Sequence, residues 1–295
     1  MRVVFVHFSG GFGNQLFQLA LAQQTKSTIS NKIRVFCLYI DNYQTDRKST
    51  ECREAFKYIR TIAKGKGIKF IRIKVGEFWY LKLFWYFTIS IWVKLRIIRT
   101  TVFSWPFSFN FEEFINLVVT KKRPILIKGY FQDLLSLKRG VKDVVDWLIE
   151  SDLIQRYATY DSKNYIAVHI RRGDYAQTNL GMLDDEYYSK IFRKQKLSNL
   201  DFDIYVDDKS EIEALYSQWP KYDLYDSKRK SWQTVFSDLC GYRVIYAANS
   251  TFSLWAGLVV VKRGGACFIP RPWTKFEAIM SVDVEGFSYL EASYL

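Results

Sequence analysis

Residues 2–26 read RVVFVHFSGGFGNQLFQLALAQQTK, and this stretch decides the fold class. Its first seven residues are mostly apolar and rich in β-branched side chains, which predicts a buried strand. Three glycines follow within residues 10–13, and apolar residues then recur at helical spacing between Leu16 and Leu21. A strand, a glycine turn and a helix in this order predict the first unit of an α/β fold.

The rest of the chain alternates strands and helices in a similar way. We expect further strands at residues 33–40, 68–75, 165–170, 202–206, 222–225, 242–247 and 266–269. We expect helices at residues 185–194, 209–218, 232–240 and 252–261. Such alternation is typical of a parallel sheet with helices on both faces. The sequence therefore predicts an α/β protein of two Rossmann-type domains, one spanning residues 1–155 and the other residues 156–295.

Basic residues are concentrated in one part of the chain. The formal net charge is +13, and the window from Lys57 to Arg99 holds eleven Lys or Arg against one acid, Glu77. The charge indicates an anionic partner, which could be a nucleic acid, a phosphate group or a membrane surface. Eight aromatic residues lie within residues 78–92. They favour either an interfacial helix on an anionic membrane or a core helix with a solvated basic rim.

Composition excludes several kinds of site. The four cysteines form no CxxC pair, which excludes zinc ribbons and dithiol redox motifs. Only two histidines, His7 and His169, are present, so a histidine-rich metal site is excluded as well. We find no signal peptide and no segment apolar enough to span a membrane. We therefore expect reduced thiols and a cytoplasmic location, peripheral on the inner face of the membrane if the basic window docks there.

The stretch HIRRGDY, residues 169–175, is the strongest candidate for a ligand-binding site. It lies at the carboxyl end of an expected strand, where open parallel sheets bind ligands. Arg171 and Arg172 carry forked donors that suit phosphate oxygens, and two adjacent guanidinium groups favour an anion between them. Asp174 could hold one of the arginines in place. The alternative is a surface cluster of salt bridges.

Two other stretches follow expected strands. Asp207 and Asp208 come after the strand at 202–206, where carboxylates could bind a ribose, a base edge or a metal, or cap a helix. Residues 249–257, NSTFSLWAG, open a helix whose hydroxyl groups could contact a phosphate or only cap the helix.

The glycine turn at residues 10–15, GGFGNQ, is a partial match to a dinucleotide-binding fingerprint with Asp41 as the ribose acid. The third glycine is missing, because Leu16 occupies its place, so the match is weak. A tight turn between strand and helix is the alternative. That alternative leaves unexplained the two amides, Asn14 and Gln15, at the mouth of the turn.

Three of these stretches resemble, in the right order, the signature blocks of glycosyltransferase family 11, the α-1,2-fucosyltransferases. The matching blocks are GGFGNQLFQLA at 10–20, HIRRGDY at 169–175 and NSTFSLWAG at 249–257. Shorter similar pieces are KGYFQ at 128–132, YVDD at 205–208 and FIPRPW at 268–273. Leu254 departs from the family, which usually has a first tryptophan there, and residues 78–105 have no counterpart. Both departures bear on acceptor choice or membrane contact.

The resemblance implies a GT-B-like architecture, with two Rossmann-type domains whose parallel sheets face a cleft. Residues 1–155 would form the acceptor side, and residues 156–295 would bind GDP-fucose. The implied activity is that of an inverting galactoside 2-α-L-fucosyltransferase. It moves L-fucose from GDP-fucose to the 2-OH of a galactoside in a glycan acceptor that could be lipid-linked. Neither a metal nor another cofactor is implied, and no nucleic-acid partner is expected.

The resemblance also implies roles for single residues. Arg171 and Arg172 would bind the diphosphate, while His169 and Asp208 would contact the guanine end. The other donor-binding residues implied are Ser250, Ser253, Gly13, Asn14 and Gln15. Arg171, Arg172 and Asp174 are the expected catalytic residues. The general base is left open among the nearby acids Asp174, Asp184, Asp185 and Glu186.

Two alternatives stay open at this point. A non-catalytic protein that binds nucleotides or polyanions at a membrane surface would also explain the basic aromatic window, and turnover of GDP-fucose would distinguish it from an enzyme. A nicotinamide oxidoreductase would require Asp41 to bind a ribose.

Overall fold

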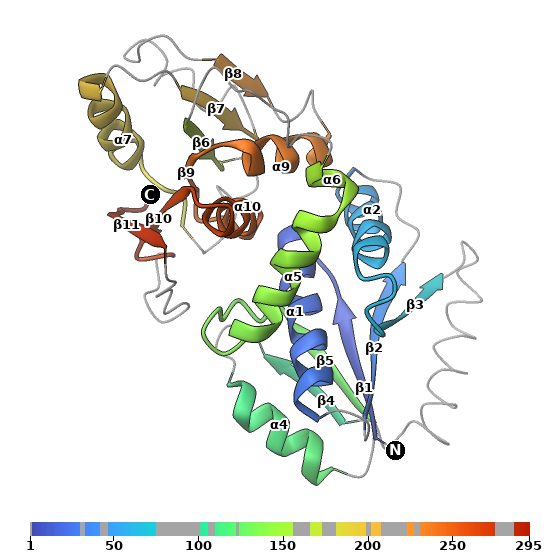
Figure 1. Ribbon diagram of the computed structural model, residues 1–295. Helices are drawn as coiled ribbons and strands as arrows, with labels where there is room; N and C mark the ends of the chain where they lie inside the picture. Colours follow the sequence, from blue (N-terminus) through green and yellow to red (C-terminus); the bar gives the residue numbers. More distant parts are fainter. Residues whose placement is uncertain are drawn as a thin grey trace. The chain divides into compact units, whose positions relative to one another are not determined.

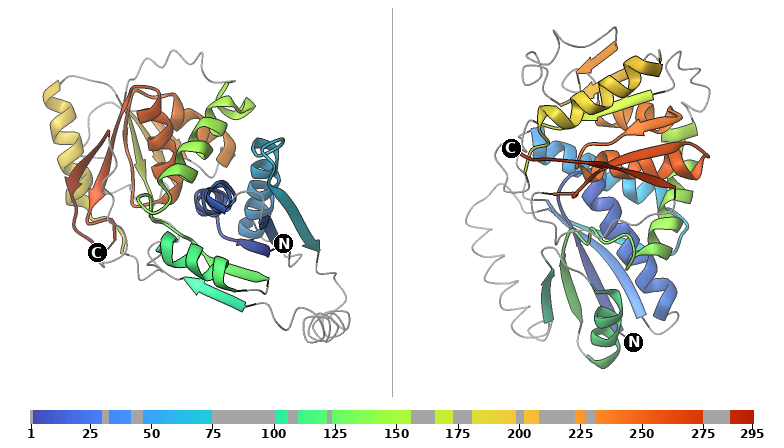
Figure 2. Two further views of the ribbon diagram at one scale, coloured as in Figure 1. Left: turned by 60° about the horizontal axis from the view of Figure 1, so that its bottom comes forward. Right: turned by 90° about the vertical axis from the view of Figure 1, so that its left-hand side faces the viewer.

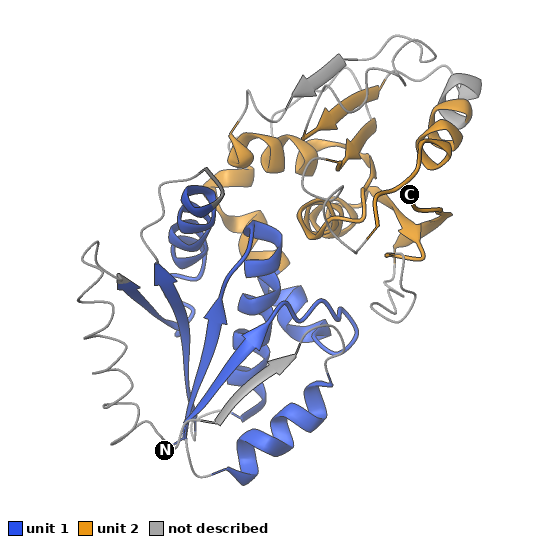
Figure 3. Ribbon diagram, turned by 180° about the vertical axis from the view of Figure 1, so that it is seen from behind, with its two compact units in different colours: residues 1–144 blue, residues 145–295 orange. Residues whose placement is uncertain are grey.

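The structure, a computed structural model, describes residues 2–29, 33–41, 47–74, 101–105, 110–121, 124–155, 166–172, 181–198, 202–207, 223–226, 231–274 and 286–295. The chain divides into two compact units, residues 1–144 and 145–295 (Figure 3). The division expected from the sequence, after residue 155, lies at the end of the short helix α6 (Asp152–Gln155).

The first unit contains a parallel sheet in the order β3-β2-β1-β5-β4 (Figure 1). Its strands are β1 (Arg2–Phe8), β2 (Ile33–Asp41), β3 (Lys69–Lys74), β4 (Thr101–Trp105) and β5 (Ile125–Gly129). The helices are α1 (Phe12–Ile29), α2 (Arg47–Ile62), α4 (Phe111–Thr120) and α5 (Lys138–Glu150), which continues into the second unit.

Helix α1 covers one face of this sheet, as Figures 1 and 3 show from opposite sides. Val4, Val6 and Phe8 of β1 are buried, whereas the residues between them are only partly buried, as expected for alternating side chains. Helix α5 packs closely on α1 at Gly140, where a Cβ atom would lie 2.1 Å from the Ala20 carbonyl oxygen. This contact requires a glycine at position 140.

The second unit contains a parallel sheet in the order β11-β10-β9-β6-β7-β8. Its strands are β6 (Ile166–Ile170), β7 (Phe202–Val206), β8 (Asp223–Asp226), β9 (Val244–Tyr246), β10 (Ala266–Arg271) and β11 (Phe287–Glu291). The helices are α6, which is introduced above, α7 (Asp185–Ser198), α9 (Trp232–Gly241) and α10 (Thr251–Lys262). The expected pair of parallel-sheet α/β units is therefore confirmed.

The strands expected from the sequence are all present, with bounds that shift by no more than a few residues. The expected helices at 185–194, 232–240 and 252–261 are also present as α7, α9 and α10. The expected helix at 209–218 lies outside the described residues.

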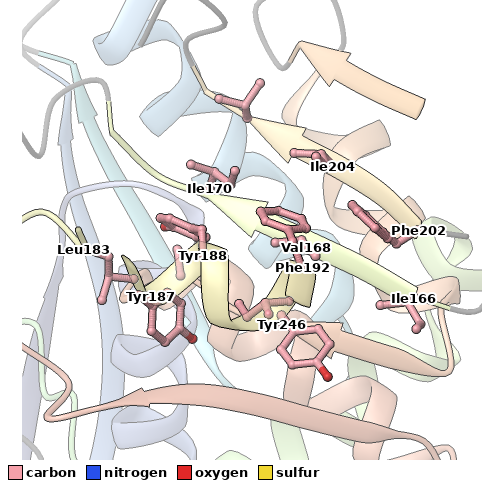
Figure 4. Packing of buried hydrophobic residues seen from close by; sticks show 13 residues of the cluster. Ile166, Val168, Ile170, Leu183, Tyr187, Tyr188, Phe192, Phe202, Ile204 and Tyr246 are labelled. Atoms are coloured by element: carbon pink, nitrogen blue, oxygen red, sulfur yellow. The ribbon is translucent and has the colours of Figure 1, made fainter. Parts of the chain in front are cut away.

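Helices pack on both faces of the second sheet, as the left view of Figure 2 shows for α7 and α10. The face under α7 is apolar, because Ile166, Val168 and Ile170 of β6 pack against Tyr187, Tyr188 and Phe192 of the helix (Figure 4). The opposite face lies under α9 and α10, where the His169 ring is 6.1 Å from that of Phe252 in α10. Alternate residues of β6 therefore point to different helices.

The order of the strands creates a switch point between β6 and β9. From β6 the chain passes through α7 to β7 on one side, and from β9 it passes through α10 to β10 on the other. The two strands pair directly, with Val168 opposite Tyr246. In open parallel sheets, ligands bind outside the carboxyl ends of the strands at such a point.

No helix in the described part of the chain is long and apolar enough to cross a membrane. The aromatic centre of the basic window, residues 78–92, lies outside the described residues.

Candidate functional site

The candidate site is built at the carboxyl ends of β6 and β9 in the second unit. His169 lies near the end of β6, and Arg171 and Arg172 are the first two residues after this strand. Ser250 follows β9 and precedes the first turn of α10. Because β6 and β9 are neighbours in the sheet, these groups emerge at the same edge.

The Arg172 side chain is almost fully buried, with 5% of the residue exposed. Its Nη2 atom donates to Oδ1 of Asp185 in the first turn of α7, and its guanidinium carbon lies 5.7 Å from the centre of the Tyr188 ring. The Nε atom is buried and has no hydrogen-bond partner among the described residues. The structure thus holds the Arg172 guanidinium in one place by an ion pair and an aromatic ring.

Asp207 organises the other arginine and the backbone of this turn. Its Oδ2 atom lies 3.2 Å from Nε of Arg171, and its Oδ1 atom accepts a hydrogen bond of 2.9 Å from the backbone N–H of Arg172. About a third of the Arg171 side chain is exposed. One carboxylate therefore fixes the turn that follows β6 and leaves Arg171 partly open to solvent.

His169 is buried and uncharged at neutral pH. Burial, helped by the neighbouring Arg171, lowers the pKa of His169 to about 3. Its Nδ1 atom is buried without a hydrogen-bond partner in the described part of the chain. A neutral imidazole can donate through one ring nitrogen and accept through the other, which suits recognition of a base edge better than pairing with a phosphate.

Ser250 is the N-cap residue directly before α10, yet its side chain makes no capping hydrogen bond to the helix. The first N–H groups of a helix carry partial positive charge and commonly bind anions. Ser253 is fully buried, and its hydroxyl lies 3.2 Å from the Ser250 carbonyl oxygen, to which it donates. Ser253 therefore stabilises the turn at the start of α10. The expected direct contact of Ser253 with the donor substrate stays a prediction.

Two expected site residues, Asp174 and Asp208, lie outside the described residues. Within the described part of the chain, Asp207 pairs with Arg171 and Asp185 with Arg172, and the expected contact of Asp174 with an arginine stays a prediction. The position of Asp207 after β7 signalled its place at this edge. Nothing in the sequence signalled that Asp185, at the start of α7, would pair with Arg172.

The remaining expected residues, Gly13, Asn14 and Gln15, lie at the start of α1 in the first unit. Gln15 is fully buried, and its Nε2 atom donates to the carbonyl oxygens of Gly10 and Cys52 at 2.9 Å each. It therefore ties the glycine turn to α2. Asn14 is partly exposed, and its Oδ1 atom accepts a hydrogen bond of 3.1 Å from Nε2 of Gln132 in the loop after β5.

Sequence reasoning missed Gln18, which joins the ends of β1 and β5. Its Oε1 atom accepts from the Ser9 backbone N–H at 3.0 Å, and its Nε2 atom donates to the Gly129 carbonyl oxygen at 2.9 Å. The one signal in the sequence was that helical spacing puts Gln18, a polar residue, on the face of α1 that points to the core.

Comparison with known proteins gives distant relatives. No protein-family model matches the chain. The chain is 26% identical over 302 residues to the O-antigen biosynthesis glycosyltransferase WbnK of Escherichia coli, an alignment that covers 90% of this chain and 93% of that protein. It is 28% identical over 132 residues to an α-1,2-colitosyltransferase of Escherichia coli, covering 41% of this chain and 44% of that one.

Solved structures give weak likenesses. One is the Escherichia coli heptosyltransferase WaaC with ADP, with 12% identity, coverage of 99% and 94% of the two chains, and a TM-score of 0.47. Another is the fucosyltransferase NodZ from Bradyrhizobium, with 14% identity, coverage of 88% and 92%, and a TM-score of 0.45. TM-scores below 0.5 say nothing of the reaction. What the sequence alignments give is a distant relationship of this chain to glycosyltransferases.

Proposed function

We propose that this protein is an inverting fucosyltransferase that transfers L-fucose from GDP-fucose to a glycan hydroxyl, the 2-OH of a galactoside. The observation that carries the proposal is the arrangement after β6. Arg171 and the buried Arg172 lie at the same sheet edge as the start of α10, at the switch point between β6 and β9. Two guanidinium groups and a helix N-terminus together suit a diphosphate.

The glycosyl-transfer part of the proposal is supported by the alignment with WbnK, which extends over nearly the whole of both chains. The fucosyl donor and the 2-OH acceptor come from the resemblance of the three sequence blocks to α-1,2-fucosyltransferases. The relative named as an α-1,2-colitosyltransferase makes a colitosyl donor the second one to test.

In the proposed reaction, the acceptor oxygen attacks C1 of fucose while the bond between C1 and the β-phosphate oxygen breaks. Negative charge grows on the departing diphosphate, and prepositioned cationic donors stabilise that charge in the transition state. Arg172 is held by Asp185 and Tyr188, so little reorganisation is needed when the charge develops. His169, neutral and buried, is proposed to contact the guanine base.

The acids considered as general base are already engaged where the structure describes them. Asp184 accepts from the Tyr187 backbone N–H and from the Ser293 hydroxyl, Asp185 pairs with Arg172, and Glu186 pairs with Arg193 at 2.7 Å. A general base must lie within hydrogen-bond reach of the acceptor hydroxyl, and a carboxylate held by other groups of the protein is less available for that contact. Among the acids considered, this leaves Asp174 as the one to test first.

The testing experiment incubates purified protein with GDP-fucose and a panel of galactosides, and reads product mass and linkage. We expect an α-1,2-linked fucosyl product and release of one GDP per transfer. Excess EDTA should leave the rate nearly unchanged, because the arginines neutralise the diphosphate. Binding of GDP with neither transfer nor hydrolysis of GDP-fucose would favour the non-catalytic alternative. A loss of rate in EDTA that Mn²⁺ or Mg²⁺ restores would contradict the metal-free mechanism.

A further inference from the structure

At the end of β5 and in the loop after it, residues 129–133, the backbone conformation places neighbouring side chains in different surroundings. Gly129 has φ +156° and Phe131 has φ +51°, a left-handed conformation that costs free energy for a residue other than glycine. Phe131 is thereby buried, at 2% exposed, while Tyr130 beside it is 41% exposed. Asp133 secures the loop by accepting hydrogen bonds from the Ser136 backbone N–H and hydroxyl at 2.9 and 2.6 Å. Such strain persists where the surroundings enforce it, often at ligand sites.

Tyr130 is unusual for this chain. The sequence contains 23 Phe, 20 Tyr and 9 Trp. Among the residues that the structure describes, four large hydrophobic side chains are exposed, namely Val119, Tyr130, Leu135 and Leu295, and Tyr130 is the one aromatic ring in that set. Every other aromatic side chain whose burial the structure describes is buried or partly buried, whereas Tyr130 is exposed on a loop that Asp133 holds in place.

The Tyr130 ring is positioned against the glycine turn after β1. A Cβ atom on Gly10, which has φ +75°, would lie 3.1 Å from Cε1 of Tyr130 and 2.9 Å from Nδ2 of Asn14. Gln132 reaches the same place, because its Nε2 atom donates to Oδ1 of Asn14. The Tyr130 ring and the Asn14 amide therefore lie beside Gly10, and the Gln132 amide is bonded to Asn14. The glycine turn follows β1 and Tyr130 follows β5, and these two strands are adjacent and parallel.

We infer that Tyr130, Asn14 and Gln132 form a subsite for a neutral hexopyranose unit of the acceptor glycan, with the apolar C–H face of the sugar on the Tyr130 ring. A pyranose presents one apolar face and a rim of hydroxyls that both donate and accept. An exposed ring flanked by amides matches that chemistry. None of the three side chains carries a charge, which fits a neutral sugar and not a diphosphate. The inference rests on the proposed function, because the acceptor is the substrate of that reaction.

The test uses the full-length protein with lactose as the acceptor probe. Tyr130→Ala should raise the KM for lactose by about tenfold or more, while the KM for GDP-fucose and the affinity for GDP stay within about twofold. Tyr130→Phe should restore most of the lost acceptor affinity, because it keeps the ring and removes only the hydroxyl. Gln132→Ala should also raise the KM for lactose. Leu135→Ala, at a residue that is 49% exposed a few positions further on, is the matched control and should behave as wild type.

A binding measurement separates contact from indirect effects. Saturation-transfer NMR should show lactose ring protons in contact with the wild-type protein, and this signal should be lost in Tyr130→Ala. An unchanged KM for lactose in Tyr130→Ala would overturn the inference. A change confined to the KM for GDP-fucose would overturn it as well, because the ring would then hold the sugar of the donor. If wild-type protein neither binds GDP nor turns over GDP-fucose, the proposed function itself fails, and this outcome is distinct from both.

Discussion

Arg171 and Arg172 are neighbours in the sequence but differ in surroundings. Arg172 is nearly buried against Tyr188, whereas about a third of the Arg171 side chain is exposed. The sequence predicted an anion between two adjacent guanidinium groups. In the structure each arginine has its own carboxylate, Asp207 for Arg171 and Asp185 for Arg172. This arrangement still leaves donors for a diphosphate, because a guanidinium has five N–H groups.

The first prediction separates the roles of the two arginines. Arg171→Ala and Arg172→Ala should each lower kcat with GDP-fucose by about a hundredfold, as loss of a transition-state donor does. Arg172→Ala should also lower the free energy of unfolding by about 1–2 kcal/mol, because a buried side chain is removed. Arg193→Ala, which breaks a largely exposed pair with Glu186, is the control and should change neither quantity appreciably. Near-wild-type kcat in both site variants would remove them from the diphosphate site.

The second prediction concerns the pH dependence of stability. The pKa of His169 is lowered to about 3, so between pH 6.5 and 3 the unfolded chain binds a proton that the folded chain does not. The free energy of unfolding should therefore fall as the pH falls, and His169 should account for about 2 kcal/mol between pH 7 and pH 5. His169→Gln should remove this part of the decline, which urea unfolding at the two pH values would measure. An equal decline in both proteins would show that His169 is protonated in the folded state.

The third prediction tests how tightly the glycine turn is packed. Gly10 and Gly65 have similar φ angles, +75° and +78°, but a Cβ atom on Gly65 would meet nothing within 4 Å. Both alanine variants carry the strain of a left-handed conformation, about 1–2 kcal/mol, and Gly10→Ala adds a close contact with Asn14 and Tyr130. Gly10→Ala should therefore unfold at a lower urea concentration than Gly65→Ala. Equal midpoints would mean that Tyr130 is not held against the turn.

At the scale of elements, the sequence predicts best where apolar runs are short and strong. β6 and β7 are buried at every position, and their sequences IAVHI and FDIYV suffice to place them. Helix α2 was not expected from the sequence. Its buried residues Phe56 and Ile59 lie among basic residues, which hide the helical spacing of the apolar side chains. The pairing of Arg172 with Asp185 was also beyond sequence reasoning, because it depends on which face of β6 lies under α7.

The fourth prediction concerns the buried polar contact between β7 and the end of α9. The Tyr242 hydroxyl donates to Asp203 of β7 and lies 3.1 Å from the Tyr205 hydroxyl. Tyr242→Phe should lower the free energy of unfolding by about 1–3 kcal/mol, because the buried Asp203 carboxylate loses a donor. The affinity for GDP should stay unchanged, because the buried Asp203 carboxylate is bonded to Tyr242. Combining Tyr242→Phe with Asp203→Asn should cost less than the sum of the two changes. A loss of GDP affinity without a loss of stability would instead indicate that Asp203 contributes to nucleotide binding.

At the scale of the whole molecule, charge is distributed unevenly along the chain. Of the net charge of +13, a net +10 comes from residues 57–99, from eleven basic residues and one acid. Part of this window is described, and there Lys57, Arg60, Lys64 and Lys69 are exposed at the end of α2 and the start of β3. Exposed cations of this kind attract an anionic surface, whatever the structure of the aromatic residues that follow.

The fifth prediction is that the protein binds anionic membranes through this window. Each basic residue near an anionic surface contributes about 1 kcal/mol, so reversing three charges in Lys57→Glu/Arg60→Glu/Lys64→Glu should release the protein from vesicles that contain anionic lipid. The control reverses Lys138 and Arg139, which are exposed on α5 outside the window, and should leave binding nearly intact. Co-sedimentation with neutral and anionic vesicles, at low and high salt, measures vesicle binding of both variants.

Because the attraction between the basic window and the vesicle is screened over about 10 Å at 0.1 M salt, high salt should weaken binding. If wild-type protein never sediments with vesicles, or does so regardless of lipid charge and salt, the basic window has another partner, and the acceptor need not be presented at a membrane.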